Sequence, residues 1–306
     1  MFYTMTLNPA LDYNMTLKEF APGMVNRAVK EEIIPGGKGL MVSRMLKNLG
    51  IESTAFGLVA GFTGAELARR VHELGIRTSF VSLPEGMTRI NVKLWGSLEG
   101  EINAVGPVCD EKSLQALFEK LTMLTKEDTL VLSGSVPASL PKDVYVDMIK
   151  HVKEKSPRIA VDATGELLRN TLSYCPFLIK PNHHELGELY GTELTNKEVV
   201  AVYAKKLREE GARNVLVSMA GDGAVLAAED GSVWFGEAPG GQVMNTVGSG
   251  DSMVAGFLAG YEERHDAETA FKKGIASGSA SAFSCQLGTK DEVEALLQNV
   301  QVRRVE

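Results

Sequence analysis

A glycine-rich turn that contains a carboxylate lies near the end of the chain, at Asn245-Thr246-Val247-Gly248-Ser249-Gly250-Asp251-Ser252. The apolar residues that follow, Met253 to Leu258, are spaced as on a helix, so the glycines immediately precede its first turn. Backbone N–H groups and the helix dipole make such a turn an anion site, and glycine lets phosphate approach without a Cβ clash. An aspartate there repels phosphate unless magnesium or an acceptor hydroxyl lies between. This arrangement suits a general base for phosphoryl transfer.

We expect Asp251 to take a proton from the attacking hydroxyl. The N–H groups of Gly248, Ser249 and Gly250 would stabilise the charge that develops on the phosphoryl group. The simpler alternative is that Asp251 caps a helix, as acidic residues commonly do. A dinucleotide site is disfavoured, because Met253 stands where the third glycine of G-x-G-x-x-G belongs.

A second glycine turn, Pro35-Gly36-Gly37-Lys38-Gly39, precedes another helical pattern that ends at Gly50. It lacks the spacing of a Walker P-loop. Its glycines let the backbone approach a polar ligand, and Lys38 supplies a cation. The alternative is a flexible turn with a solvated lysine.

The segment from Thr88 to Trp95 alternates in polarity like a half-exposed strand. Arg89, Asn91 and Lys93 therefore share one face. Two cations and an amide suit a bound phosphate, whereas the alternative is a solvated strand face. Asp12, near the end of an early β-rich segment, is expected to accept hydrogen bonds from substrate hydroxyls, unless it is only a turn carboxylate.

Composition places the chain among globular proteins, with 306 residues, 44% hydrophobic and 23% charged. A net charge of −7 argues against nucleic-acid binding. Three widely spaced cysteines, Cys109, Cys175 and Cys285, predict neither a disulfide framework nor a zinc site. The N-terminal segment lacks the features of a signal peptide, and no run approaches the roughly 20 apolar residues of a membrane span. We expect a cytoplasmic protein that does not bind membranes.

Short apolar runs alternate with helical patterns along most of the chain, which predicts an α/β fold with a mainly parallel, helix-covered sheet. The expected strands are 2–7, 54–59, 129–132, 158–161, 177–179 and 214–218, and 199–211 is an expected crossover helix. Two segments with alternating polarity break this rhythm and predict a separate antiparallel sheet. We expect a core of residues 1–11, 35–86 and 106–306, and a lid formed by insertions 12–34 and 87–105.

Together these motifs resemble the PfkB, or ribokinase-like, carbohydrate kinase family over essentially the whole chain. Four matches occur in the family's order: the Gly36 to Gly39 turn, Asn182-His183-His184-Glu185 as the N-x-x-E motif, Ser218 to Gly223 as a nucleotide loop, and Asn245 to Asp251. The resemblance implies a ribokinase-like, Rossmann-type α/β core with a small β-sheet lid. It also implies ATP as co-substrate and Mg²⁺.

The resemblance assigns roles to residues. Glu185 would hold Mg²⁺ through water. The acceptor would contact Asp12, Gly36, Gly37, Lys38, Gly39, Arg89, Asn91, Lys93 and Asn103, and the nucleotide would contact Asn182, Ser218, Gly221, Gly223, Thr246, Gly248, Gly250 and Ser281. Ser281 lies in a small-residue segment, Gly278 to Phe283, that permits an adenine edge or close helix packing, and for each individual residue the composition favours packing. His183 and His184 point about 100° apart on a helix, so we expect two surface residues rather than a shared metal site.

Thr6 to Asp12 resembles the family's sugar-phosphate branch, and segments 88–93 and 101–103 most resemble its 1-phosphofructokinases. That implies conversion of fructose 1-phosphate and ATP to fructose 1,6-bisphosphate and ADP. The alternatives are tagatose-6-phosphate kinase, 6-phosphofructokinase and, in another class, a noncatalytic sugar-phosphate sensor.

Two positions depart from the family pattern. Met41 replaces a common asparagine and cannot make its amide contacts. The nucleotide loop reads Ser218-Met219-Ala220-Gly221 where S-L-G is common. Separately, the exposed sheet of the lid predicts a homodimer formed through it.

Overall fold

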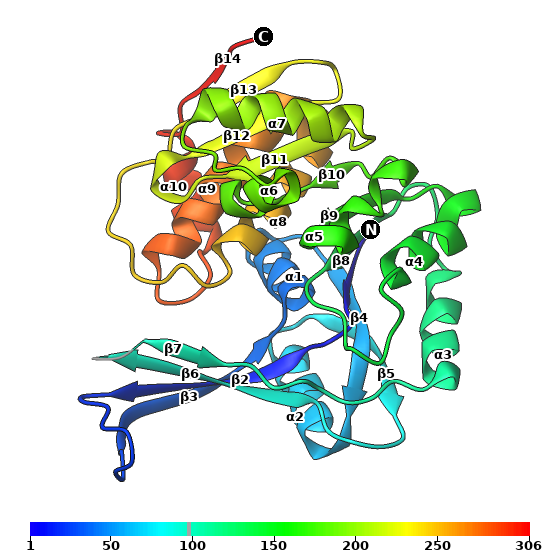
Figure 1. The fold of residues 1–306 in the computed structure, drawn as a ribbon, viewed down its shortest axis with the longest axis vertical. Helices are drawn as coiled ribbons and strands as arrows, with labels where there is room; N and C mark the ends of the chain where they lie inside the picture. The colour runs from blue at the N-terminus through cyan, green and yellow to red at the C-terminus, as the bar shows by residue number, and fades with distance from the viewer. Residues whose placement is uncertain (97–98) are drawn as a thin grey trace.

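The computed structural model describes residues 1–96 and 99–306, and a ten-stranded sheet runs through them (Figure 1). Its order is β14-β13-β12-β11-β10-β9-β8-β1-β4-β5. The strands are β1 (Phe2–Thr6), β4 (Ser53–Ala60), β5 (Arg77–Leu83), β8 (Thr129–Ser133), β9 (Arg158–Asp162), β10 (Leu178–Ile179), β11 (Asn214–Ser218), β12 (Ala224–Ala227), β13 (Val233–Gly236) and β14 (Val302–Arg304). Strands from β5 to β11 are parallel, and β12, β13 and β14 are added antiparallel.

Helices cover both faces of this sheet, which explains why its strands are continuously apolar. One face packs against α1 (Lys38–Asn48), α2 (Gly61–Glu73), α8 (Ser249–Arg264) and α9 (Ala267–Phe283), with α10 (Lys290–Leu297) on α9. The other packs against α3 (Glu111–Leu121), α4 (Val144–Val152), α5 (Gly165–Arg169), α6 (His183–Tyr190) and α7 (Lys197–Glu209). The predicted α/β class is confirmed. Within the described residues, no helix combines the length and apolarity needed to cross a bilayer.

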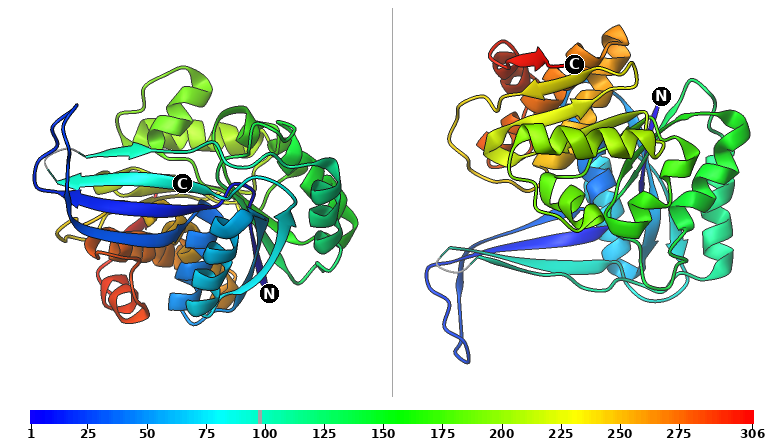
Figure 2. Two further views of the ribbon diagram at one scale, coloured as in Figure 1. Left: turned by 90° about the horizontal axis from the view of Figure 1, so that it is seen from below. Right: turned by 45° about the horizontal axis from the view of Figure 1, so that its top comes forward.

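A smaller sheet projects from this body, as two orientations show (Figures 1 and 2). It consists of β2 (Ala10–Leu17), β3 (Ala28–Gly36), β6 (Arg89–Gly96) and β7 (Gly100–Ile102) in the order β3-β2-β6-β7. β3 and β7 pair antiparallel with their neighbours, but β2 and β6 run parallel, which the alternating pattern did not predict. The reason is topological: β1 and β5 are parallel strands, and each leads from its carboxyl end into the small sheet. We call this sheet the lid.

Polar side chains gather on one face of the large sheet at its carboxyl edge. Thr6, Ser133 and Asp162 end three adjacent strands, and Ser133 is in register with Asp162. On the same face, two positions before Ser133 and Asp162, Val131 and Ala160 pack in the apolar cluster that includes α1 and α8. Both helices begin above this edge, where parallel α/β folds commonly place their sites.

Candidate active site

The predicted turn before α8 has the geometry of an anion site. Gly248 is the N-cap of α8 with φ +81°, a left-handed conformation that favours glycine. Ser249 and Gly250 are the first helical residues, where N–H groups lie outside the i→i−4 ladder of the helix; Ser249 N donates instead to Thr246 O at 3.2 Å. Asp251 follows in the first turn with 8% of its surface exposed. A carboxylate is therefore buried in the first turn of a helix that starts at a glycine-rich turn.

The second glycine turn brings the lid and α1 together. A Cβ atom on Gly36 would lie 2.4 Å from Oδ2 of Asp12, so only glycine permits this approach. Lys38 is the first residue of α1, and its ammonium lies 3.1 Å from Oδ1 of Asp162. The turn thus contacts Asp12 of β2 through Gly36 and, two residues later, begins α1 with Lys38.

Two charged residues that the sequence did not single out complete this region. Asp162 ends β9 with 1% exposure, and Lys180 follows β10 with 4% exposure. Lys180 Nζ lies 3.6 Å from Asp162 Oδ1 and would lie 3.2 Å from a Cβ on Gly250. Asp162 is the last residue of its short apolar strand, and Lys180 directly follows another. A charge at this position is the sequence signal that could have pointed to both residues.

Burial and charge shift the protonation of this cluster. Burial, followed by the Asp162 carboxylate, raises the pKa of Asp251 to about 7, although Lys38 and Lys180 act in the opposite direction. Burial also acts to raise the pKa of Asp162, but the Lys180 and Lys38 ammonium groups outweigh it and hold that pKa below its ordinary value. Burial disfavours charged Lys38, yet Asp162 and Asp251 raise its pKa above the usual range. Asp251 is therefore the carboxylate best suited to exchange a proton near neutral pH.

A cavity of about 560 Å³ lies beside the turn, which is the size of a cofactor site. Residues predicted to bind nucleotide line it: Asn182, Ser218, Gly221, Gly223, Thr246 and Gly250, together with Ser249. Its apolar wall is formed by Ala238, Pro239, Val243, Met253, Ala282 and Phe283. Ala282 and Phe283 belong to the small-residue segment that the sequence offered as an adenine edge, whereas Ala238, Pro239 and Val243 were not singled out. Polar loops thus form one end of the cavity and apolar side chains the other.

One residue near this cavity is placed differently from its prediction. Ser281 is 1% exposed, and its hydroxyl contacts Ser252 Oγ at 2.7 Å and accepts from Gly288 N, so it belongs to helix packing rather than the cavity. Its helical neighbours Gly278, Ser279 and Ala282 face the cavity instead. His183 and His184 were expected at the surface: His184 is exposed and His183 is partly buried. Both also line the cavity, with ring centroids 3.9 Å apart.

The N-x-x-E residues form a capping box at the start of α6. Asn182 Oδ1 accepts from Glu185 N, and Glu185 Oε2 accepts from Asn182 N, both at 2.8 Å. This bond uses one oxygen of Glu185 and leaves Oε1 for another ligand. A single carboxylate next to a phosphate site matches the preference of Mg²⁺ for few protein ligands and several waters, so the donor set fits that ion.

The cationic strand of the lid makes contacts of its own. Asn91 Nδ2 donates to Asp12 Oδ1 at 2.8 Å, and Lys93 Nζ lies 3.6 Å from Asp12 Oδ2 and 3.4 Å from Glu101. Arg89 donates to the carbonyl oxygens of Asn8 and Ala104. These bonds fix the Asp12 carboxylate and the base of the lid. Asn103 is exposed just beyond β7.

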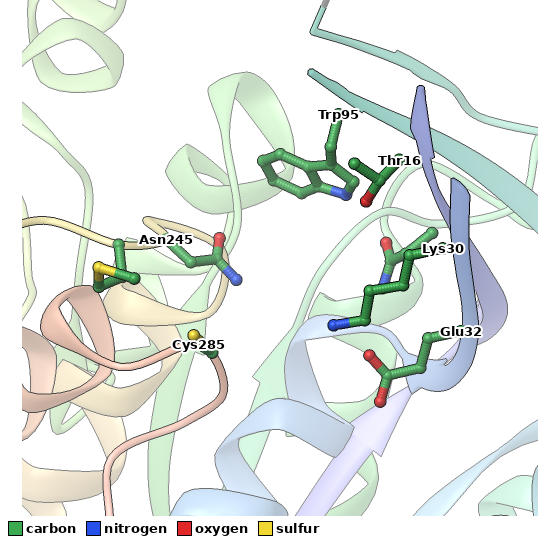
Figure 3. A pocket seen from close by; sticks show the side chains of 8 residues that line it. Thr16, Lys30, Glu32, Trp95, Asn245 and Cys285 are labelled. Atoms are coloured by element: carbon green, nitrogen blue, oxygen red, sulfur yellow. The ribbon is translucent and has the colours of Figure 1, made fainter. Parts of the chain in front are cut away.

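A second cavity, of about 190 Å³, lies between the lid and the segment before α8 (Figure 3). Thr16, Lys30, Glu32 and Trp95 point into it from the lid, and Asn245 and Cys285 face them from the core. Asn14, two residues beyond Asp12 on β2, also lines it. This cavity therefore lies farther along β2 than Asp12.

The two departures from the family pattern have structural consequences. Met41 is 5% exposed, and its Sδ would lie 3.9 Å from a Cβ on Gly248, so it packs under the catalytic turn. Ala220 adopts φ +49°, a left-handed conformation in which the common glycine is unstrained. The nucleotide loop thus forms without glycine at this position.

Comparison with known proteins agrees with this geometry. Residues 5–293 match the pfkB family of carbohydrate kinases. The chain is 45% identical to a 1-phosphofructokinase of Bacillus subtilis (strain 168), with 100% of both chains covered, and 34% identical to a D-tagatose-1-phosphate kinase of Bacillus licheniformis, with 99% of each covered. A crystal structure of a putative phosphofructokinase from Staphylococcus aureus superimposes with TM-score 0.89 at 37% identity, covering 100% of this chain and 99% of that one. The chain therefore belongs to the pfkB family of carbohydrate kinases and has the ribokinase-like fold.

Proposed function

We propose that this kinase transfers the γ-phosphoryl group of ATP to fructose 1-phosphate, giving fructose 1,6-bisphosphate and ADP. The observation that carries the proposal is the buried Asp251 at a glycine-lined helix start, next to the residues Ser249 and Gly250 that line a nucleotide-sized cavity. The 45% identical relative supports the acceptor. D-tagatose 1-phosphate is the second candidate, because the 34% identical relative is named for it and both sugars carry their phosphate at C1.

In the proposed mechanism, Asp251 accepts the proton of the acceptor hydroxyl as that oxygen attacks the γ-phosphorus in line. The N–H groups of Gly248, Ser249 and Gly250 stabilise the transferring phosphoryl group. On the acceptor side, Asp12 receives sugar hydroxyls, and Gly36 to Gly39 approach the sugar with Lys38 as a cation. Arg89, Asn91, Lys93 and Asn103 are proposed to border the sugar-phosphate site.

On the nucleotide side, we propose contacts from Asn182, Ser218, Gly221, Gly223, Thr246, Gly248 and Gly250, and we omit Ser281 because its hydroxyl faces Ser252. Glu185 would hold Mg²⁺ through a water, and the ion would neutralise charge on the triphosphate. These residues bind and orient ATP so that its terminal phosphate meets the start of α8.

An ATP-consumption assay with four acceptors tests the function: fructose 1-phosphate, tagatose 1-phosphate, fructose 6-phosphate and tagatose 6-phosphate. We expect the highest kcat/KM with fructose 1-phosphate. Preference for a 6-phosphate would contradict the proposed acceptor. Binding of a sugar phosphate without turnover of any would identify a sensor instead.

We further propose that two copies associate through the outer face of the lid, in the cytoplasm where ATP is available. Tyr13, Met15, Val92 and Leu94 alternate with the inward-facing polar residues and remain partly exposed, and Ile102 is 64% exposed. An apolar sheet face of this kind is commonly covered by a partner. Light scattering at micromolar concentration should give a dimer, and Leu94→Lys should give a monomer; a monomeric native protein would refute this.

A further inference from the structure

The Asp162 carboxylate occupies the centre of a buried charge cluster that the proposed mechanism does not yet use. Its Oδ1 faces two ammonium groups, at 3.1 Å from Lys38 and 3.6 Å from Lys180. Its Oδ2 accepts no hydrogen bond from the backbone or other donors among the described residues. Oδ1 is thus paired with two ammonium groups, whereas Oδ2 is available to accept a hydrogen bond.

Asp251 is the group that can use the available oxygen. Lys180 Nζ lies 3.6 Å from Asp162 Oδ1 and would lie 3.2 Å from a Cβ on Gly250, so the Asp162 carboxylate lies beside the turn that carries Asp251. Each of the two carboxyl groups also shifts the pKa of the other. Two ionised carboxylates have no hydrogen between them, so a bond between them requires that one carries a proton. The two ammonium groups on Asp162 Oδ1 keep that residue ionised, so the proton belongs on Asp251.

The charges around Asp251 come from every neighbouring element. Asp162 ends β9, Lys180 follows β10, and Lys38 begins α1. Glu185 of α6 acts on Lys38 from the nucleotide side. Lys180 also lies under Gly250, in the turn where a phosphate would bind. The cluster therefore contains two cations, Lys38 and Lys180, and three carboxylates, Asp162, Asp251 and Glu185.

We propose that Asp162 is a positioning residue for phosphoryl transfer: held ionised by Lys38 and Lys180, it makes Asp251 the proton acceptor and then accepts a hydrogen bond from protonated Asp251. The acceptor O–H bond breaks, and its proton moves to Asp251. The oxygen forms a bond to the γ-phosphorus while the bond from that phosphorus to ADP breaks. Asp162 exchanges no proton, and its charge strengthens the base. This inference rests on the proposed function of Asp251.

Asp162→Asn and Asp162→Glu test the proposal by the pH dependence of kcat with fructose 1-phosphate. In the wild-type protein, kcat should fall below about pH 7, because Asp251 must be ionised to act. Asp162→Asn removes the neighbouring negative charge and leaves both lysines, so the midpoint should move down by at least about one pH unit and the plateau should fall at least about tenfold. Asp162→Glu restores the charge and should return the midpoint toward that of wild type.

A merely structural role for Asp162 predicts another outcome. Misplaced groups would lower kcat in both variants without moving the midpoint, and that result would overturn the proposal. An altered Mg²⁺ requirement with an unmoved midpoint would overturn it as well. Circular dichroism of both variants establishes that they are folded before kinetics are compared.

A readout without turnover separates this inference from the acceptor assignment. ¹³C NMR of protein labelled at aspartate carboxyl carbons should show one carboxyl that titrates near pH 7 and disappears in Asp251→Asn. Its midpoint should fall in Asp162→Asn. If no acceptor is phosphorylated but this shift occurs, the charge coupling stands and the proposed function fails. If fructose 1-phosphate is phosphorylated but the titration midpoint does not change in Asp162→Asn, the role proposed for Asp162 is wrong and the proposed function stands.

Discussion

The ammonium of Lys38 lies 3.1 Å from Oδ1 of Asp162, so the first glycine motif is tied to a carboxylate 124 residues later in the chain. Asp162 is 1% exposed on its side chain, whereas Lys38 is 37% exposed and can still face a ligand. The pair joins the start of α1 to the end of β9. This pair holds the two segments next to each other although they are far apart in the sequence.

This pair should contribute to stability. Lys38→Met should lower the free energy of unfolding by on the order of 2 kcal/mol, because a buried carboxylate loses its nearer cation while Lys180 remains. Urea denaturation measures the change. Lys290→Met, which removes an exposed pair with Glu294, is the matched control and should change it by less than about 0.5 kcal/mol. Equal changes in the free energy of unfolding for the two variants would show that the buried Lys38–Asp162 pair stabilises the protein no more than an exposed pair does.

Asp251 should make the protein less stable as pH rises. Its raised pKa, about 7, means that the folded state holds a proton that the unfolded chain releases near pH 4. Stability is fully present below pH 4 and is lost as pH rises through 7. Asp251→Asn should therefore be more stable than wild type at pH 8.5 by at least about 1 kcal/mol, with little difference at pH 4. Thermal unfolding at both pH values tests this; a pH-independent difference would contradict the assignment.

Arg89→Ala should raise the KM for the sugar phosphate much more than the KM for ATP. Its guanidinium lies at the base of the lid, bonded to the carbonyls of Asn8 and Ala104, on the acceptor side of the site. An increase on the order of tenfold or more corresponds to the loss of one charge-assisted contact. Arg77→Ala, at an exposed pair with Glu52, is the control. Equal changes in both KM values would indicate a structural role.

Ala220→Gly should stabilise the protein by about 0.5–1 kcal/mol, because Ala220 adopts φ +49° and glycine has no Cβ penalty there. Ala201→Gly in the interior of α7 should have the opposite sign and a similar size. Chemical denaturation of the two variants measures both. Destabilisation by Ala220→Gly would show that the loop is not strained.

Local patterns predicted the parts of the site that depend on neighbouring residues. The glycine turns before α1 and α8, and the N-x-x-E start of α6, depend on spacing within a few residues. Asp162 and Lys180 could not be assigned in this way, because their roles arise from the order of strands in the sheet. Each is a lone charge after a short apolar run, a pattern that many surface positions share.

Helical phase explains the Ser281 error. The small residues of α9 alternate between the cavity and the contact with α8, and composition cannot tell which side each one faces. The two histidines at the start of α6 were predicted at the surface, and their position beside the cavity was not predicted because the apolar wall of the cavity is distant in sequence. The parallel pairing of β2 with β6 likewise follows from topology rather than local alternation.

The most direct test of the account is the turnover of Asp251→Asn with fructose 1-phosphate, together with ATP binding by calorimetry. Loss of the base should lower kcat by on the order of hundreds-fold or more while ATP binding stays within about threefold of wild type. Turnover close to that of the wild-type protein would contradict the role of Asp251 as base.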